Sequence, residues 1–246
     1  MLTSVKRAGK KLLLDLGYDL IPSGKLPSDF TEQEKELVRR VSPYTMTTPE
    51  RIYGLKTAVE YLVAHDIRGT IVECGVWRGG SMMVVADTLL ALGKPERDLY
   101  LFDTFEGMTK PTKEDGNQAM ARFAQQKTGE DSSDWCYASL ADAQACLGQT
   151  DYPPNKIHFV KGKVEETIPE QAPDEIALLR LDTDWYSSTR HELVHLFPRL
   201  VKGGVLFVDD YGRWQGARQA VDEYFSQNNI AMLLNRLDTT GRIGIK

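Results

Sequence analysis

The 246-residue chain contains little of what several protein classes require. Its three cysteines, Cys74, Cys136 and Cys146, match neither a zinc-ligand spacing nor a disulfide framework, so we expect a reducing, cytoplasmic setting. The net charge of −5 leaves no excess of basic residues for phosphate binding, and we expect no nucleic-acid partner. No run approaches the roughly 20 apolar residues of a membrane span, so no such span is expected.

The N-terminal segment does not have the pattern of a signal peptide. Four basic residues between positions 6 and 11 precede a short apolar run, but Asp15 interrupts that run and no small-residue cleavage site follows. Residues 3–16 could form a weakly basic amphipathic helix on a surface. We favour packing of this segment on the protein body or on a partner chain, and we expect a homo-oligomer.

The chain from Thr70 onward alternates strands, loops and helices. Apolar runs bounded by turn residues predict buried strands. The five strands are expected within residues 70–76, 98–108, 156–169, 176–184 and 205–211. The helices are expected at residues 81–93, 118–127, 139–148, 188–201 and 216–227. A terminal hairpin would turn near residues 239–241. Alternating strands and helices predict a doubly wound, Rossmann-like α/β sheet.

The part before this sheet has helices but no strands. A short helical patch covers residues 32–41, and a helix is expected from about 48 to 65, with Thr47 and Glu50 as its capping box. We predict that residues 1–66 form a helical appendage or lid on a catalytic domain of residues 67–246. Residues 109–137 are polar and resemble an insertion into that domain.

Carboxylates follow two of the predicted strands directly. Asp182 and Asp184 end one apolar run, and Asp209 and Asp210 end the next. Ligands bind at the carboxyl ends of strands in open α/β sheets, and four crowded carboxylates would repel one another without a cation. Oxygen ligands of this kind suit Mg²⁺. In the simpler interpretation, each Asp only caps the helix that follows.

A glycine-containing turn, ECGVWRGGS, follows the first strand. Gly75, Gly79 and Gly80 do not have the spacing of the dinucleotide fingerprint, which argues against a pyrophosphate cofactor. These glycines could bring the backbone close to a ligand, or they could simply make a tight turn. Asp103 ends the second strand, where a carboxylate can bind ribose hydroxyls, or it caps a helix. A glycine turn, a ribose carboxylate and metal carboxylates together fit S-adenosylmethionine, which has a ribose but no phosphate.

Six segments, in order, give the chain a specific family resemblance. They are TMTTPERIYGL, VECGVWRGGS, LFDTFEGM, GKVEETIP, LRLDTDWYSST and VDDYGRWQGAR. The chain resembles, from about Pro43 to its C-terminus, the macrocin O-methyltransferase family. The resemblance implies transfer of a methyl group from S-adenosylmethionine to a sugar hydroxyl of a glycoside, with Mg²⁺ bound.

The resemblance also implies roles for individual residues. Asp182, Asp209 and Asp210 would hold the metal ion, and Asp184 would be the general base. The cofactor would contact Met46, Thr47, Glu73, Gly75, Gly79, Ser81, Asp103 and Ser139. Of these, Ser139 would lie near the adenine, Asp103 at the ribose, and Met46 and Thr47 would close over the site.

Two alternatives from other classes remain open. A metal-dependent glycosyltransferase could use the Asp182-Thr183-Asp184 motif, although this would leave the glycine turn and Asp103 without roles. A non-catalytic S-adenosylmethionine-binding module could keep the fold, although four unneutralised carboxylates would be costly. Three histidines, at positions 158, 191 and 195, are available as bases, and we interpret them as structural.

Overall fold

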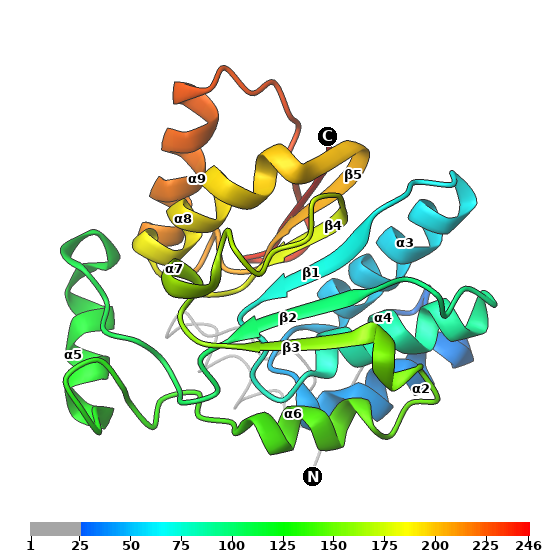
Figure 1. Ribbon diagram of the computed structural model, residues 1–246, viewed down its shortest axis with the longest axis horizontal. Helices are drawn as coiled ribbons and strands as arrows, with labels where there is room; N and C mark the ends of the chain where they lie inside the picture. Colours follow the sequence, from blue (N-terminus) through cyan, green and yellow to red (C-terminus); the bar gives the residue numbers. More distant parts are fainter. Residues whose placement is uncertain (1–25) are drawn as a thin grey trace, which may run out of the picture.

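The structure is a computed structural model that describes residues 26–246, so the predicted helix at residues 3–16 lies outside the described part. Within residues 26–246, seven strands form a single sheet in the order β3-β2-β1-β4-β5-β7-β6 (Figure 1). Strands β1 to β5 are parallel, and β7 is antiparallel to both β5 and β6. The doubly wound, Rossmann-like sheet predicted from the alternation of strands and helices is confirmed.

The central strands end at the same level. The strands are β1 (Thr70–Cys74), β2 (Leu99–Asp103), β3 (Ile157–Lys161), β4 (Ile176–Leu181), β5 (Leu200–Val208), β6 (Asn235–Arg236) and β7 (Arg242–Ile245). Cys74 pairs with both Phe102 and Leu181, and Leu181 pairs with Val208. The loops after β1, β2, β4 and β5 therefore leave the sheet side by side.

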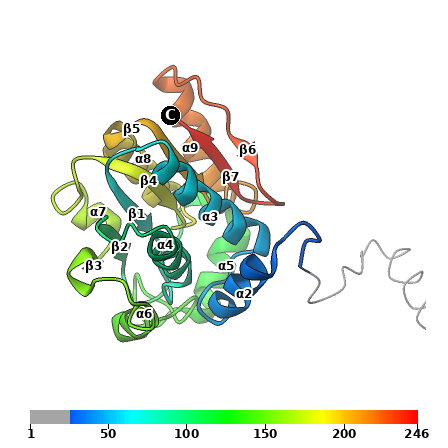
Figure 2. The same cartoon turned by 90° about the vertical axis from the view of Figure 1, so that its right-hand side faces the viewer.

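Helices cover both faces of the sheet (Figure 2). One layer contains α2 (Glu32–Val41), α3 (Pro49–Ala64), α4 (Gly80–Ala91) and α6 (Leu140–Leu147), and the other contains α7 (Val164–Thr167), α8 (Tyr186–Leu196) and α9 (Gln215–Gln227). Successive strand residues point to opposite faces. Ile71 accordingly packs in the core under the first layer, and Val72 packs in the core under the second. Among residues 26–246, no helix is both long and apolar enough to cross a membrane.

The helices before β1 pack into the same core as the sheet. Val41 of α2 and Ile52 of α3 are almost fully buried, and they belong to the hydrophobic cluster that contains Met82 of α4. An amphipathic helix gains most of its stability from such packing. The predicted division at residue 66 therefore separates segments that share a core, and it stays a prediction as a domain boundary.

Two boundaries differ from the sequence prediction. The cap of α3 is Thr48 and not Thr47, because the Thr48 hydroxyl accepts a hydrogen bond from the backbone N–H of Arg51 at 3.3 Å. Helix α8 ends at Leu196 and not at 201. Pro198 has no backbone N–H to continue the helical hydrogen bonds, so the chain tightens into a 3₁₀ turn at Phe197–Arg199 and then enters β5 at Leu200, before the predicted start at 205.

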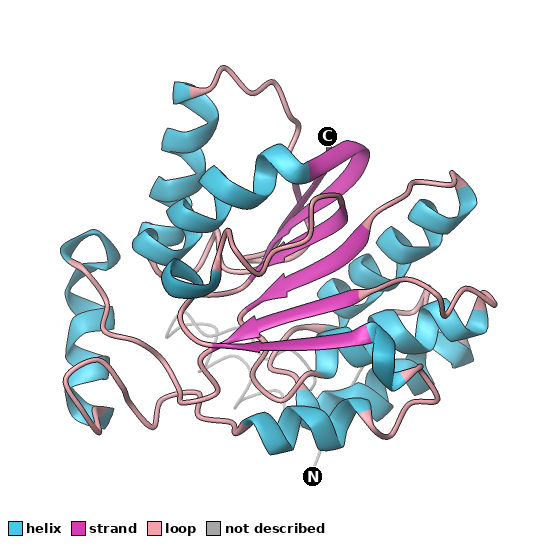
Figure 3. Ribbon diagram, viewed as in Figure 1, coloured by secondary structure: helices cyan, strands magenta, loops and turns pink. Residues whose placement is uncertain are grey.

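The segment between β2 and α6 extends away from both helix layers. It contains α5 (Gly116–Gln126), close to the predicted helix at 118–127, after a short 3₁₀ turn at Lys113–Asp115. Figure 3 shows α5 beyond the carboxyl ends of the strands. The two ends of the segment meet, because the Met108 N–H donates to the Trp135 carbonyl at 2.9 Å. Residues 109–137 are thus positioned over the strand ends.

Candidate active site

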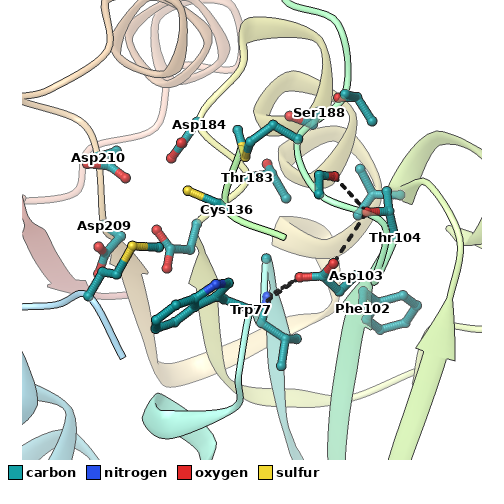
Figure 4. Close-up of a pocket in the computed structure, with 18 of the residues that line it drawn as sticks. Trp77, Phe102, Asp103, Thr104, Cys136, Thr183, Asp184, Ser188, Asp209 and Asp210 are labelled. Atoms are coloured by element: carbon teal, nitrogen blue, oxygen red, sulfur yellow. Dashed lines mark hydrogen bonds between the residues drawn. The ribbon is translucent and has the colours of Figure 1, made fainter. Parts of the chain in front are cut away.

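A cavity of about 320 Å³ lies at the carboxyl ends of β1, β2, β4 and β5. The chain runs from β1 outward to β2 and β3 in one direction and to β4 and β5 in the other, so the cavity lies at the switch point of the sheet. Its walls come from the loops after these strands, from residues 45–47 before α3, and from the 109–137 segment. Figure 4 shows carboxylates on one side of this cavity and Asp103 on another.

Three carboxylates form an open cluster in the cavity. Oxygen atoms of Asp182, Asp184 and Asp210 all lie within 4.8 Å of one another (Figure 4). Burial raises the pKa of each of these carboxyls, and the negative charge of neighbouring carboxylates raises it further. Three hard oxygen donors that repel one another are a suitable site for a cation such as Mg²⁺. Asp184 has a positive φ of 71°, which turns it from the extended path of β4.

Asp209 lies beside this cluster but has arginine partners. Its Oδ1 accepts a hydrogen bond from Arg180 Nη2 at 2.5 Å, and its Oδ2 is ion-paired with Arg51. The side chain is only 5% exposed. The structure therefore brings Asp184, and not Asp209, together with Asp182 and Asp210. The assignment of Asp182, Asp209 and Asp210 as the ligand set stays a prediction.

Arg180 is the centre of a buried charge network. Arg180 lies near the carboxyl end of β4 and reaches Glu73 Oε1 at 2.5 Å and Asp182 Oδ2 at 2.8 Å, in addition to Asp209. Burial raises the pKa of Glu73 to about 7, although Arg180 opposes this shift. Arg51 extends the network, because its Nε lies 2.9 Å from Asp238 Oδ2 in the C-terminal hairpin. The charged Arg180 within the apolar run of β4 is the sequence signal for such a network, and it was not among the predicted site residues.

The glycine turn has two backbone functions. Gly75 has a φ of 84°, and a Cβ there would lie 2.2 Å from the Asp182 carbonyl oxygen, so only glycine fits against the end of β4. Gly79 has a φ of 89° at the start of α4 and packs against Leu147. The glycines thus make the tight turn of the simpler interpretation. Gly75 and Ser81 also line the cavity, as expected for cofactor contacts.

Asp103 connects β2 to the glycine turn. Its Oδ2 accepts hydrogen bonds from the N–H groups of Trp77 at 3.0 Å (Figure 4) and Val76 at 2.6 Å. Its Oδ1 accepts one from the N–H of Phe105 at 2.7 Å. A loop, not a helix, follows Asp103, so the helix-cap alternative is wrong. The Thr104 hydroxyl also lies 3.4 Å from Oδ1, but it donates to the Gly107 carbonyl at the shorter distance of 2.9 Å. A carboxylate has about four acceptor positions, so the three N–H groups leave capacity for a ribose hydroxyl in the cavity.

The other predicted cofactor contacts divide into two groups. Met46 and Thr47 line the cavity, and the Thr47 hydroxyl is buried without a hydrogen-bond partner among residues 26–246. Glu73 and Gly79 do not line the cavity: Glu73 is fully buried next to Arg180. Ser139 is also absent from the lining, and its hydroxyl instead accepts a hydrogen bond from the Asp142 N–H at 3.2 Å, as the N-cap of α6.

None of the four histidines, all within the described part of the chain, lines the cavity. His158 bonds to Asp98 at 2.8 Å on the outer strand, and His191 contacts the Ile168 carbonyl at 2.9 Å. The prediction that these histidines are not bases agrees with their positions. Asp184 is the remaining candidate base next to the cavity.

A group of three tryptophans joins the 109–137 segment to the catalytic loops. The rings of Trp135, Trp185 and Trp214 meet edge to face, with centroids 5.4 to 5.7 Å apart. Trp185 follows Asp184 directly and is 1% exposed. Asp115 adds a second attachment, because its Oδ1 accepts a hydrogen bond from the Tyr186 N–H at 2.7 Å. The insertion is therefore fixed against the carboxylate cluster.

The doubly wound sheet and its cavity at the switch point define a Rossmann-like fold, in which ligands bind at the carboxyl ends of the strands. The model of the macrocin O-methyltransferase family matches residues 25–243. The chain belongs to this family, and it is an O-methyltransferase. The sequence-based resemblance is confirmed, and the glycosyltransferase and non-catalytic alternatives are wrong.

Individual relatives agree with this assignment. The chain is 31% identical over 236 residues to the 8-demethyl-8-(2,3-dimethoxy-alpha-L-rhamnosyl)-tetracenomycin-C 4'-O-methyltransferase of Streptomyces olivaceus, covering 94% of this chain and 88% of that protein. It is 29% identical over 198 residues to the demethyldecarbamoylnovobiocin O-methyltransferase of Streptomyces niveus, covering 80% and 74%. The solved structure of the O-methyltransferase NovP superposes with a TM-score of 0.75 at 27% identity, covering 88% and 89%.

Proposed function

We propose that this enzyme transfers a methyl group from S-adenosylmethionine to a hydroxyl of a sugar or glycoside, and that a divalent cation such as Mg²⁺ assists. The observation that carries this proposal is the open cluster of Asp182, Asp184 and Asp210 in a cavity that also contains Asp103. Carboxylates suited to a cation and a carboxylate suited to a ribose hydroxyl line the same cavity, which supports the proposal.

Residues around β1 and β2 fit the methyl donor. Asp103 retains an acceptor position for a ribose hydroxyl, and the main chain at Gly75 lines the same wall. The buried Thr47 hydroxyl and the hydroxyl of Ser81 provide polar partners for the methionine end. Buried polar groups normally have hydrogen-bond partners, so an unpaired Thr47 hydroxyl favours a polar ligand at this position.

The carboxylates would supply metal ligands and the base. Asp182 and Asp210 would hold the cation, and Asp209 would support Asp182 through their shared partner Arg180 or ligate directly as the resemblance implies. A bound divalent cation supplies positive charge that favours ionisation of a nearby hydroxyl. Asp184 would take the proton at its carboxylate oxygen as the hydroxyl oxygen bonds to the methyl carbon. The bond from that carbon to the sulfonium sulfur would break, and S-adenosylhomocysteine would leave. Asp184 is within reach of a hydroxyl near the cation, because its carboxylate oxygen lies within 4.8 Å of those of Asp182 and Asp210.

The sugar acceptor rests on the relatives. The name of the Streptomyces olivaceus enzyme specifies methylation of a rhamnosyl tetracenomycin, and a further relative, 30% identical over 199 residues, is the mycinamicin III 3''-O-methyltransferase of Micromonospora griseorubida. We infer an acceptor of the same general kind, with a hydroxyl placed next to Asp184.

The test is a methyl-transfer assay with purified enzyme, S-adenosylmethionine and a panel of glycosides, with mass spectrometry as the readout. We expect one added methyl group in the presence of Mg²⁺ and loss of transfer in excess chelator, with activity restored by added Mg²⁺. Undiminished transfer in chelator would remove the metal from the proposal. Failure with every hydroxylated sugar, while S-adenosylmethionine binds, would remove the sugar acceptor.

A further inference from the structure

Two arginines line the cavity next to the group of three tryptophans. The Arg122 guanidinium of α5 lies 4.3 Å from the centroid of the Trp135 ring, and the Arg213 guanidinium lies 5.0 Å from that of Trp214. The two tryptophan rings are themselves 5.7 Å apart. Stacking on an indole holds a guanidinium in place while its N–H groups stay available. The two cations are therefore held on one aromatic wall, and both residues are exposed.

The other cations of the cavity wall have carboxylate partners. Arg180 and Arg51 belong to the buried network around Asp209, and Lys163 is ion-paired with Asp131. Among residues 26–246, neither Arg122 nor Arg213 forms an ion pair, and neither guanidinium forms a hydrogen bond with another residue. In a chain of net charge −5, two unpaired cations that face one cavity indicate an anionic ligand.

These arginines lie on the acceptor side of the cavity. Arg213 follows Asp210 by three residues, and its backbone N–H donates to the Asp210 carbonyl at 3.0 Å. Its backbone is therefore next to the carboxylate cluster. Burial raises the pKa of the Cys136 thiol, and Arg122 lies close enough to oppose that rise. Figure 4 places Cys136 near Asp184. The predicted donor contacts at Gly75, Ser81 and Asp103 come instead from the ends of β1 and β2.

We propose that the acceptor carries an anionic oxygen group, a phosphate or a carboxylate, that binds to Arg122 and Arg213 while its hydroxyl lies at Asp184. A guanidinium presents paired N–H donors that match the oxygens of both groups. This inference rests on the proposed function, because it specifies the substrate class of the same site. The two sources of such a group are a sugar phosphate or nucleotide-activated sugar, and a glycoside that contains a carboxylate.

Binding measurements test the charge requirement directly. Isothermal titration would compare three probes in the presence of S-adenosylhomocysteine and Mg²⁺: neutral methyl glucoside, glucose 1-phosphate and methyl glucuronoside. The proteins are the wild type, Arg122→Gln, Arg213→Gln, the double variant and the control Arg218→Gln, which changes an exposed arginine of α9 outside the cavity lining. Uridine diphosphate glucose, as a fourth probe, distinguishes a nucleotide-activated sugar from a simple phosphate.

We expect an anionic probe to bind the wild type at least tenfold more tightly than methyl glucoside, and to bind less tightly at higher salt. Each cavity substitution should weaken that binding about ten- to a hundredfold, as expected for loss of hydrogen bonds to a charged group. The Arg218→Gln control should bind like the wild type. Equal binding of neutral and anionic probes by the wild type would overturn the inference, as would equal losses in the control.

Methyl transfer separates this inference from the proposed function. For an anionic acceptor that the wild type methylates, the double variant should have a higher KM and a nearly unchanged kcat, because the arginines bind a group remote from the reacting hydroxyl. Neutral glycosides methylated with a kcat/KM as high as that of anionic acceptors would overturn the anionic group and leave the sugar methyltransferase intact. A kcat/KM for anionic acceptors that is unchanged in the double variant would do the same. Arginine-dependent anion binding without transfer to any sugar would instead overturn the proposed function.

Discussion

Asp209 and Asp210 are neighbours at the end of β5, and their surroundings are opposite. Both carboxylate oxygens of Asp209 are paired with arginines, whereas Asp210 faces Asp184 and has a raised pKa. A carboxylate saturated by guanidinium groups is stabilised as an anion but has little capacity for other partners. A carboxylate next to carboxylates has unused acceptor capacity and an unfavourable charge. The partner, and not the residue type or its place on the strand, separates a framework carboxylate from one that is available for chemistry.

The largest effect should come from the open cluster. Asp184→Asn keeps the shape of the side chain but cannot accept a proton at neutral pH, so we expect kcat to fall by about 10² to 10⁴. Titration of S-adenosylmethionine should give an affinity within about tenfold of the wild type. If raising the Mg²⁺ concentration restores turnover, Asp184 is a metal ligand and the base lies elsewhere.

Loss of the arginine partner should lower the free energy of unfolding. Arg180→Gln leaves the buried carboxylates of Glu73 and Asp209, and the partly exposed one of Asp182, without their shared cation. Removing one partner of a buried ion pair costs about 3–5 kcal/mol, and we expect a loss of that size in the free energy of unfolding measured in urea. The surface control Arg218→Gln should stay within about 0.5 kcal/mol. An Arg180 variant as stable as this control would contradict a framework role for the network.

Asp103 adds a third kind of partner, backbone N–H groups. Asp103→Ala removes the acceptor for the Val76, Trp77 and Phe105 N–H groups and for the proposed ribose hydroxyl. Loss of a hydrogen bond to a charged group costs about 1.5–3 kcal/mol, so S-adenosylmethionine should bind about ten- to a hundredfold more weakly. Adenine, which lacks the ribose, is the matched probe. If adenine binding falls by the same factor, the variant has disturbed the turn and not a ribose contact.

The smallest effect, on stability, is expected at Glu192. This buried carboxyl belongs neither to the arginine network nor to the carboxylate cluster. It accepts a hydrogen bond from the Thr183 hydroxyl at 2.9 Å, and burial raises its pKa well above the ordinary value of 4.5. Folding therefore favours its protonated form. The stability that this group contributes is fully present below pH 4.5, and it is lost as the pH rises toward the folded-state pKa.

Glu192→Gln keeps a neutral side chain that can accept the Thr183 hydrogen bond at any pH. We expect the variant to match the wild type in free energy of unfolding at pH 4 and to exceed it at pH 8, as measured by urea unfolding at both values. A stability difference that does not change with pH would mean that Glu192 does not titrate in this way.

The positions of the strand ends could be predicted from the sequence because they are local features. Apolar runs that stop at Asp103, Asp182 and Asp209 define where each strand ends, and parallel pairing then places these residues at one edge. The helix at residues 32–41, the N-cap at Ser139 and the terminal hairpin follow from equally local signals. Family resemblance added the enzyme class, which spacing alone did not determine.

The partners of these side chains could not be predicted, because they depend on tertiary contacts. Arg51 lies 158 positions from Asp209 in sequence, and the hydrophobic pattern of α3 gives no sign that it reaches the cavity. Ser139 illustrates the converse: the family resemblance implied a cofactor contact, whereas its hydroxyl accepts a hydrogen bond from the Asp142 N–H at the start of α6. The left-handed backbone of Asp184 is a further feature that no local pattern indicated.

The meeting of the ends of the 109–137 segment has an evolutionary consequence. Met108 and Trp135 share a backbone hydrogen bond, and a Cβ at Gly107 would lie 1.9 Å from the Ser133 carbonyl oxygen, so the chain leaves and re-enters the fold at one point. A closed loop can change in length at little entropic cost and without moving the strands on either side. Descendants of a common ancestor can therefore replace this segment while the strands and the methyl-transfer residues stay the same. The three tryptophans would attach the new segment, and the acceptor could change with it.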